Sequence, residues 1–276
     1  TDMDMVSCGF LNTLEESLKE GKVTEEQINA ACRRVLEAKY KLGLFSDPYK
    51  YCDTLRTREK LYTAEHRSSA RTIATETFVL LKNDHHLLPL DIKGKIALIG
   101  PMADARNNMC GMWSMTCTPS RHGTLLEGIR SAAGDKAEIL YAKGSNIYYD
   151  AETEKAATGI RPLERGDNRQ LLDEALRIAA RADVIVAALG ECAEMSGESV
   201  SRTNLEIPDA QQDLLKALVK TGKPVVLLLF TGRPLVLNWE ATNVHSILNV
   251  WFGGSETGDA VADVPVSYTH LTLPTS

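Results

Sequence analysis

The sequence predicts an α/β fold built around a mostly parallel β-sheet. Short runs rich in Val, Ile and Leu alternate with amphipathic stretches of helical period. Such alternation is typical of parallel strands that helices cover on both faces. The expected strands are residues 95–100, 137–142, 183–189, 224–230 and 246–252, and the expected helices lie near 124–133, 168–181 and 209–221.

Long connections follow three of these expected strands and indicate where a site would lie. They cover residues 101–123, 143–167 and 190–208. An open α/β sheet places its binding site in the loops at the carboxyl ends of its strands. Connections of this length inside a compact domain are usually functional.

The first part of the chain has helical period instead. Leu11, Leu14 and Leu18 share one face of a first expected helix, which Gly21 ends. A second helix begins with a capping-box pattern at 24–27, carries an apolar stripe from 28 to 42 and stops at Gly43. The polar stretch 46–62, with Pro48, is a linker candidate, and a further helix is expected near 64–77.

Composition excludes several classes of function. The chain has 31 Lys and Arg against 37 Asp and Glu, a net charge of −6, which argues against nucleic acid as a partner. No apolar run reaches the roughly 18 residues of a membrane span. Six cysteines without a CxxC pattern are expected to be scattered buried thiols. Nothing in the sequence indicates the oligomeric state.

The connection 190–208 concentrates ionisable residues. It contains Glu191, Glu194, Glu198, Glu206 and Arg202. A glutamate at the carboxyl edge of a sheet suits general acid/base chemistry if burial raises its pKa. By position and residue type alone, a solvated loop glutamate is the simpler interpretation.

Several motifs follow one another in a characteristic order. They are MSGESVSR, LEIPDAQQDLLKAL, GKPVVLLLFTGRPL and VWFGGSETGDAVADV, and upstream TDMDM and INAACRRVLEAKYKLGLFSDPY. In this order they resemble the family 3 glycoside hydrolases, the periplasmic-type bacterial β-glucosidases and their xylosidase relatives. The resemblance implies four parts: 1–45, the last unit of a (β/α)8 barrel; 46–68, a linker; 69–264, an αβα sandwich truncated at its C-terminal end; and 265–276, a tail expected to be non-native.

The resemblance also implies an activity and site residues. The reaction is retaining hydrolysis of terminal non-reducing β-D-glucosyl residues by two carboxylates. Glu198 matches the family's acid/base, and Arg202 is expected to favour its ionised form. The nucleophile is expected in none of these residues, because its segment precedes TDMDM; Asp2 and Asp4 would only cap the last barrel strand. The candidate substrate-binding residues are Trp113, Met195, Ser196 and Arg202.

The implied partners are β-glucosides and oligosaccharides, with no nucleic acid, membrane, metal or organic cofactor, in the periplasm or outside the cell. Sulfur-rich residues 109–117 would suit Cu(I), but the family's Gly-x-Trp-Ser loop there favours packing or an aromatic sugar contact. Two alternatives stay open: a non-catalytic carbohydrate-contacting module or inert fragment, and a β-xylosidase. A nucleotide binder is the weakest option, since no GxGxxG or Walker pattern is present.

Overall fold

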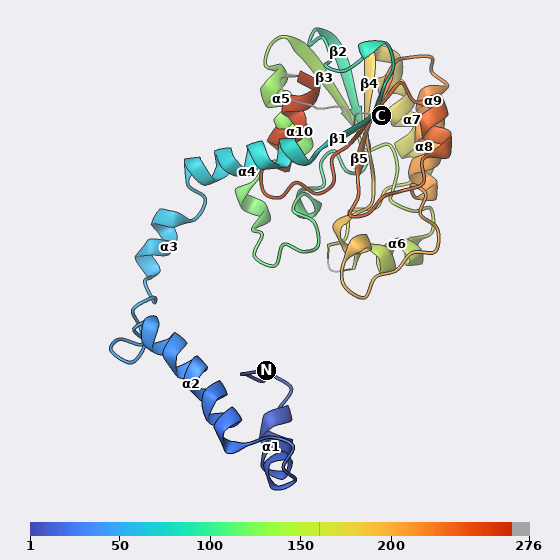
Figure 1. The fold of residues 1–276 in the computed structure, drawn as a ribbon. Helices are drawn as coiled ribbons and strands as arrows, with labels where there is room; N and C mark the ends of the chain where they lie inside the picture. The colour runs from blue at the N-terminus through green and yellow to red at the C-terminus, as the bar shows by residue number, and fades with distance from the viewer. Residues whose placement is uncertain (160, 267–276) are drawn as a thin grey trace. The chain divides into compact units, whose positions relative to one another are not determined.

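The computed structural model describes residues 1–159 and 161–266, and the chain divides into two compact units. The first unit is Thr1–Thr63 and the second begins at Ala64. Figure 1 shows the helices of the first unit and the sheet of the second. Each unit is described by itself.

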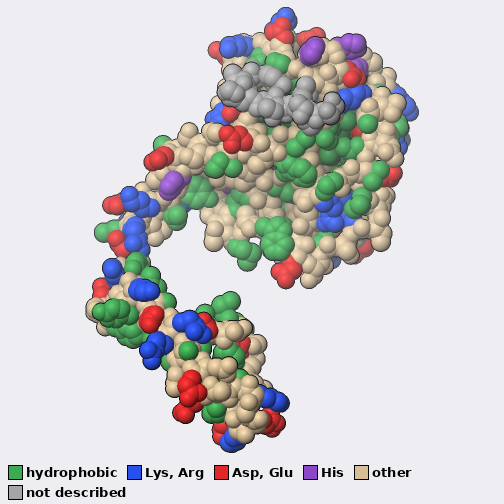
Figure 2. Space-filling model, viewed as in Figure 1, with side chains coloured by type: hydrophobic (Ala, Val, Ile, Leu, Met, Phe, Trp, Pro, Cys, Tyr) green, Lys and Arg blue, Asp and Glu red, His purple; other side chains and the backbone are tan. Residues whose placement is uncertain are grey.

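The first unit contains three helices, α1 (Gly9–Lys19), α2 (Glu25–Lys41) and α3 (Thr54–Lys60). The capping box is confirmed: Thr24 Oγ1 accepts a hydrogen bond from the Gln27 amide, and the Gln27 side chain accepts one from Thr24. None of the unit's residues, all of which the structure describes, is buried. Figure 2 accordingly shows hydrophobic side chains on its surface. Helix α3 lies inside the expected linker, where Asp53 caps it.

The second unit is built on a mostly parallel sheet. Among the described residues its strands are β1 (Val79–Asn83), β2 (Gly94–Ile99), β3 (Ala137–Ala142), β4 (Val184–Gly190), β5 (Val225–Phe230) and β6 (Ser246–Asn249). They lie in the order β1-β6-β5-β4-β2-β3, and β1 alone among them is antiparallel to its neighbour. The five expected strands are confirmed, and β1 adds an edge strand that the sequence pattern did not reveal.

Helices cover both faces of this sheet and form an αβα sandwich (Figure 1). Side chains of β5 alternate between two cores, so that Val226 and Leu228 enter one and Val225 and Leu227 the other. Helices α4 (Ala64–Thr77), α5 (Leu125–Ala133) and α10 (Thr257–Val266) line the first core. Helices α7 (Asn168–Arg181), α8 (Asp209–Val219) and α9 (Asn238–Asn243) line the second. A further helix, α6 (Ala151–Thr158), lies within the connection after β3.

The cysteines are not the scattered buried thiols that the sequence predicts. Cys110 and Cys117 form a disulfide, Cys8, Cys32 and Cys52 are exposed, and Cys192 is the one buried free thiol among the six, all of which the structure describes. The connection 101–123 folds back through two 3-10 turns, which brings the Cα atoms of Cys110 and Cys117 within 6.5 Å.

The boundary expected at 264 falls inside α10, and residues 267–276 of the expected tail lie outside the described residues. Across the described helices, none has the length and apolarity needed to cross a membrane.

Candidate functional site

Three connections meet at the carboxyl edge of the sheet, as the sequence predicts (Figure 1). The side chain of Asn108, on the first, accepts a hydrogen bond of 2.8 Å from the Ala193 amide on the third. Arg161, on the second, donates to the Gly111 carbonyl at 2.7 Å and pairs with Glu194 at 3.3 Å. These contacts make the three connections one continuous surface.

A buried carboxylate anchors the connection 190–208 at its start. Glu191 follows β4 and is fully buried. It accepts hydrogen bonds from Arg202 Nη1 and from Thr231 Oγ1, both at 2.7 Å, and pairs with Arg233 Nε at 3.3 Å. One negative charge therefore faces two guanidinium groups that retain little exposure, where such pairing offsets the cost of burial.

The same guanidinium groups hold the backbone of the connection. Arg202 Nη2 donates to the Glu206 carbonyl at 2.9 Å, and Arg233 donates to the Met195 carbonyl. Met195 and Glu206 flank the segment that contains Glu198 on either side. We call Glu191, Arg202 and Arg233 the carboxylate clamp, because together they restrain both ends of that segment.

Glu198 lies on the exposed turn between the clamped ends. The preceding residue, Gly197, packs so closely on the connection 101–123 that a Cβ there would lie 2.4 Å from Met112 Cγ. A side chain at this position would force the Met112 side chain or the turn itself to move. The turn that contains Glu198 is thus held at both ends by the clamp and packs through Gly197 on the connection 101–123.

Arg202, which was expected to favour the ionised form of Glu198, forms its hydrogen bonds elsewhere. Arg202 is directed to the Glu191 carboxylate and the Glu206 carbonyl instead. The physical reason is that Glu191 is buried and needs a counter-charge, whereas the exposed Glu198 is solvated.

The other predicted residues occupy two kinds of position. Trp113 is 71% exposed, on the loop that the disulfide closes. Met195 is buried, and Ser196 is partly buried, with its hydroxyl 3.5 Å from the Ala193 carbonyl. Glu198 and Trp113 are thus exposed, whereas Met195 is buried and Ser196 and Arg202 are partly buried.

An open pocket of about 380 Å³ lies beside this turn. Tyr148 from the second connection forms one part of its lining, and burial raises the pKa of that phenol. The remaining lining residues are polar for the most part and come from the third connection and α8: Ser201, Arg202, Thr203, Asn204, Glu206, Ile207, Pro208, Asp209 and Gln212.

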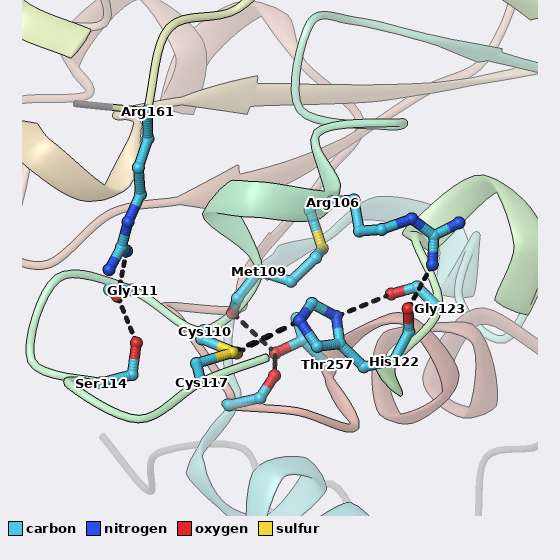
Figure 3. Close-up of a disulfide and its surroundings, with 11 residues drawn as sticks. Arg106, Met109, Cys110, Gly111, Ser114, Cys117, His122, Gly123, Arg161 and Thr257 are labelled. Atoms are coloured by element: carbon cyan, nitrogen blue, oxygen red, sulfur yellow. Dashed lines mark hydrogen bonds between the residues drawn. A yellow bond between two sulfur atoms is a disulfide. The ribbon is translucent and has the colours of Figure 1, made fainter. Parts of the chain in front are cut away.

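The disulfide lies against a histidine that the sequence reasoning missed (Figure 3). His122 Nε2 is 3.5 Å from Cys110 Sγ and 3.3 Å from Cys117 Sγ. The His122 side chain is buried, and this burial lowers its pKa. The spacing Cys-x6-Cys-x4-His was the available signal.

The clamp arginine Arg233 and the bridging Arg161 were also missed. Both are separated by dozens of residues from the carboxylates they pair with, so local patterns contain no sign of them.

Comparison with known proteins places this architecture among glycosidases. Residues 78–266 match the glycosyl hydrolase family 3 C-terminal domain. A periplasmic beta-glucosidase from Salmonella typhimurium is 42% identical over 95% of this chain and 35% of its own length. A beta-xylosidase from Formosa agariphila is 34% identical over 95% of this chain and 36% of its own length.

A solved structure of a beta-glucosidase is similar to this chain as well. The beta-glucosidase from Listeria innocua in complex with isofagomine superposes with a TM-score of 0.79 at 31% identity, over 97% of this chain and 34% of that one. The chain thus spans about a third of the length of the relatives it matches. The family match covers most of the second unit, and the chain belongs to glycoside hydrolase family 3.

Proposed function

We propose that Glu198 is the acid/base residue of a retaining β-glucosidase. The observation that supports this most is the exposed Glu198 turn, which the carboxylate clamp restrains at both ends. General acid/base catalysis requires a carboxyl group that can reach the reacting oxygen and is held in place. The other carboxylates nearby are engaged, since Glu191 binds two arginines and Glu194 pairs with Arg161.

In the proposed reaction Glu198 acts twice. It first protonates the glycosidic oxygen while a second carboxylate attacks the anomeric carbon, and it then removes a proton from the water that hydrolyses the glycosyl-enzyme intermediate. The two carboxyl groups of such a pair lie about 5–5.5 Å apart. We assign the nucleophile to the two thirds of such an enzyme that this chain does not match.

The proposed substrates are terminal non-reducing β-D-glucosyl residues of β-glucosides and oligosaccharides. Relatives named as beta-glucosidases support this class, and solved structures of the Listeria innocua enzyme contain laminaribiose and glucose. The exposed indole of Trp113 offers an apolar face against which a sugar ring can stack. A β-xyloside is the second candidate, because the Formosa agariphila relative is a beta-xylosidase.

The proposed location is the periplasm or the outside of the cell. A periplasmic relative supports it, and so does the Cys110–Cys117 disulfide, since disulfides persist in oxidising compartments.

The test compares Glu198→Gln with the unchanged residue in a full-length enzyme that contains this chain. We expect kcat/KM to fall by about 10²–10⁴-fold on β-glucosides with poor leaving groups, because a general acid contributes an effect of that size. Activated aryl β-glucosides should lose less in the glycosylation step, and azide should partly restore their turnover. Parallel assays with aryl β-xylosides decide the sugar preference.

Glu164→Gln is the matched control, an exposed glutamate on the second connection whose carboxylate has no role in the site. It should leave kcat/KM unchanged. An unchanged rate in Glu198→Gln would remove Glu198 from the mechanism. Sugar binding without turnover, abolished by Trp113→Ala, would favour a carbohydrate-contacting module instead.

A further inference from the structure

We propose that the chain contains a redox-gated metal site formed by Cys110, Cys117 and His122. When the disulfide is reduced, the two thiolates and the imidazole Nε2 bind one thiophilic cation such as Zn²⁺. The inference is independent of the proposed glycosidase chemistry, which uses none of these three residues.

The positions of the donor atoms support the site. Nε2 of His122 lies 3.5 Å from Cys110 Sγ and 3.3 Å from Cys117 Sγ. A tetrahedral ion with bonds of about 2.3 Å to sulfur and about 2.0–2.1 Å to nitrogen needs such ligands roughly 3.5 Å apart. Two of the three ligand-to-ligand distances therefore already suit Zn²⁺. The third, between the sulfur atoms, opens when the disulfide is broken, and the three donors lie within 4.8 Å of one another.

The surroundings orient the imidazole for this role. The tautomer with its proton on Nδ1 points that proton at the Gly123 carbonyl, 3.5 Å away, which leaves the Nε2 lone pair facing both sulfur atoms (Figure 3). Arg106 binds the carbonyl of His122 and so holds its backbone. At the other end, Thr257 donates to the carbonyl of Met109, the residue before Cys110, at 3.0 Å. A backbone fixed on both sides of the donors lowers the ordering cost of binding a cation.

The three candidate ligands differ in their exposure to solvent. The His122 side chain is 4% exposed, whereas both cysteines are only partly buried. An ion can thus reach the thiolates while the nitrogen ligand stays fixed, and a water molecule can complete the coordination. Thiolate and imidazole ligands bind Zn²⁺ and Cu⁺ in preference to hard cations such as Mg²⁺.

The gating step balances as thiol–disulfide exchange. A dithiol reductant supplies two electrons and two protons: the Cys110–Cys117 bond breaks, two thiols form, and the reductant becomes a disulfide. Metal binding then releases the two thiol protons. The oxidised chain has no thiolate at this place and binds no cation there.

The test uses the full chain with Cys8, Cys32 and Cys52 changed to Ser, because these exposed thiols would compete. The reduced chain, freed of reductant, is titrated with Co²⁺ as a spectroscopic probe and then with Zn²⁺. We expect one Co²⁺ per chain, with thiolate-to-cobalt charge-transfer bands and tetrahedral d–d bands that Zn²⁺ abolishes. The oxidised chain should show none of them.

Variants decide between a ligand set and a structural cluster. Cys110→Ser, Cys117→Ser and His122→Ala should each weaken Co²⁺ binding at least tenfold, while the matched control Cys192→Ser should not. His122→Cys should bind Co²⁺ again, unlike His122→Ala, and with stronger thiolate-to-cobalt bands. If the histidine had a purely structural role, this replacement would not restore binding. Circular dichroism verifies that each variant is folded. Bands that persist in His122→Ala and Cys110→Ser, or none in the reduced folded chain, would overturn the proposal.

Discussion

Helix α2 in the first unit and helix α8 in the second both have an apolar stripe, but they differ in burial. Helix α8 buries Leu214, Leu215 and Leu218 against the sheet. Helix α2 buries none of its residues, although its capping box is formed. Period and capping therefore specify a helix and its apolar face, whereas burial needs a partner surface. The sheet is that surface in the second unit.

The largest contrast should appear when one apolar side chain is removed from each unit. Phe230→Ala, at a fully buried position of β5, should lower the free energy of unfolding by about 3–5 kcal/mol, the usual cost of an aromatic cavity. Leu11→Ala, at a position that is 86% exposed, should change it very little. Denaturant unfolding followed by circular dichroism measures both. Equal losses would mean that Leu11 packs in solution.

A second contrast concerns paired charges. Glu191→Gln leaves the two clamp arginines without their buried partner and should cost about 2–3 kcal/mol, as for hydrogen bonds to charged groups. In the first unit, Arg34 forms two hydrogen bonds with Asp2, at 2.5 and 2.6 Å, but both residues are exposed. Asp2→Asn should leave the melting temperature unchanged, because water and salt screen such pairs. If Glu191→Gln and Asp2→Asn lowered stability by a similar amount, burial of the ion pair could not be the cause of the difference.

The smallest effects on stability should come from two glutamates whose pKa values are shifted in opposite directions, Glu240 in the second unit and Glu26 in the first. Burial raises the pKa of Glu240 in α9 above its ordinary 4.5, so the stability associated with its protonated form is lost as pH rises through that raised value. Glu240→Gln should therefore raise the melting temperature at pH 7 and have less effect near pH 4.5. Thermal melts over this pH range measure the difference.

The exposed Glu26 provides the opposite case. Hydrogen bonds from its own backbone amide and from Thr24 lower its pKa, so its contribution is present above 4.5 and is lost as pH falls. Glu26→Gln should lower helix α2 stability slightly at pH 7, and this difference should vanish in acid. A gain for Glu26→Gln at pH 7 would contradict the assigned cause.

Much of the second unit could be predicted because strand and helix periods are local. The strands β2, β3, β4, β5 and β6 are four to seven residues long and are built around Val, Ile, Leu and Ala, and α5, α7 and α8 have clear apolar stripes. Strand β1 was missed because its five residues, VLLKN, include only three apolar side chains and bury only Leu80. Helix α10 was missed because its sequence, TGDAVADVPV, has low helical propensity, and it forms against the first core.

Much less of the candidate site could be predicted from the chain itself. The family motifs identify Glu198 as a candidate, and the three long connections predict a site at the carboxyl edge of the sheet, where all three lie. The partner of Arg202 could not be predicted, because charge pairing depends on which carboxylate is buried, and the sequence does not show that. The Cys110–Cys117 bond was missed for a similar reason, since it requires a loop that folds back on itself.

By itself, the sequence determined the succession of strands β2 to β6 and of helices α5, α7 and α8, the family and the residue expected to catalyse. These follow from period and motif order, which are properties of neighbours in the chain. Only the tertiary structure decided that Glu191 binds Arg202 and Arg233, that Arg161 joins two connections, and that His122 faces a pair of cysteines. Arg233 and Arg161 reach carboxylates in other segments, whereas the Arg202 and His122 contacts form where one long connection folds back on itself. In both cases packing on the sheet, and not local sequence, brings the groups within hydrogen-bonding distance.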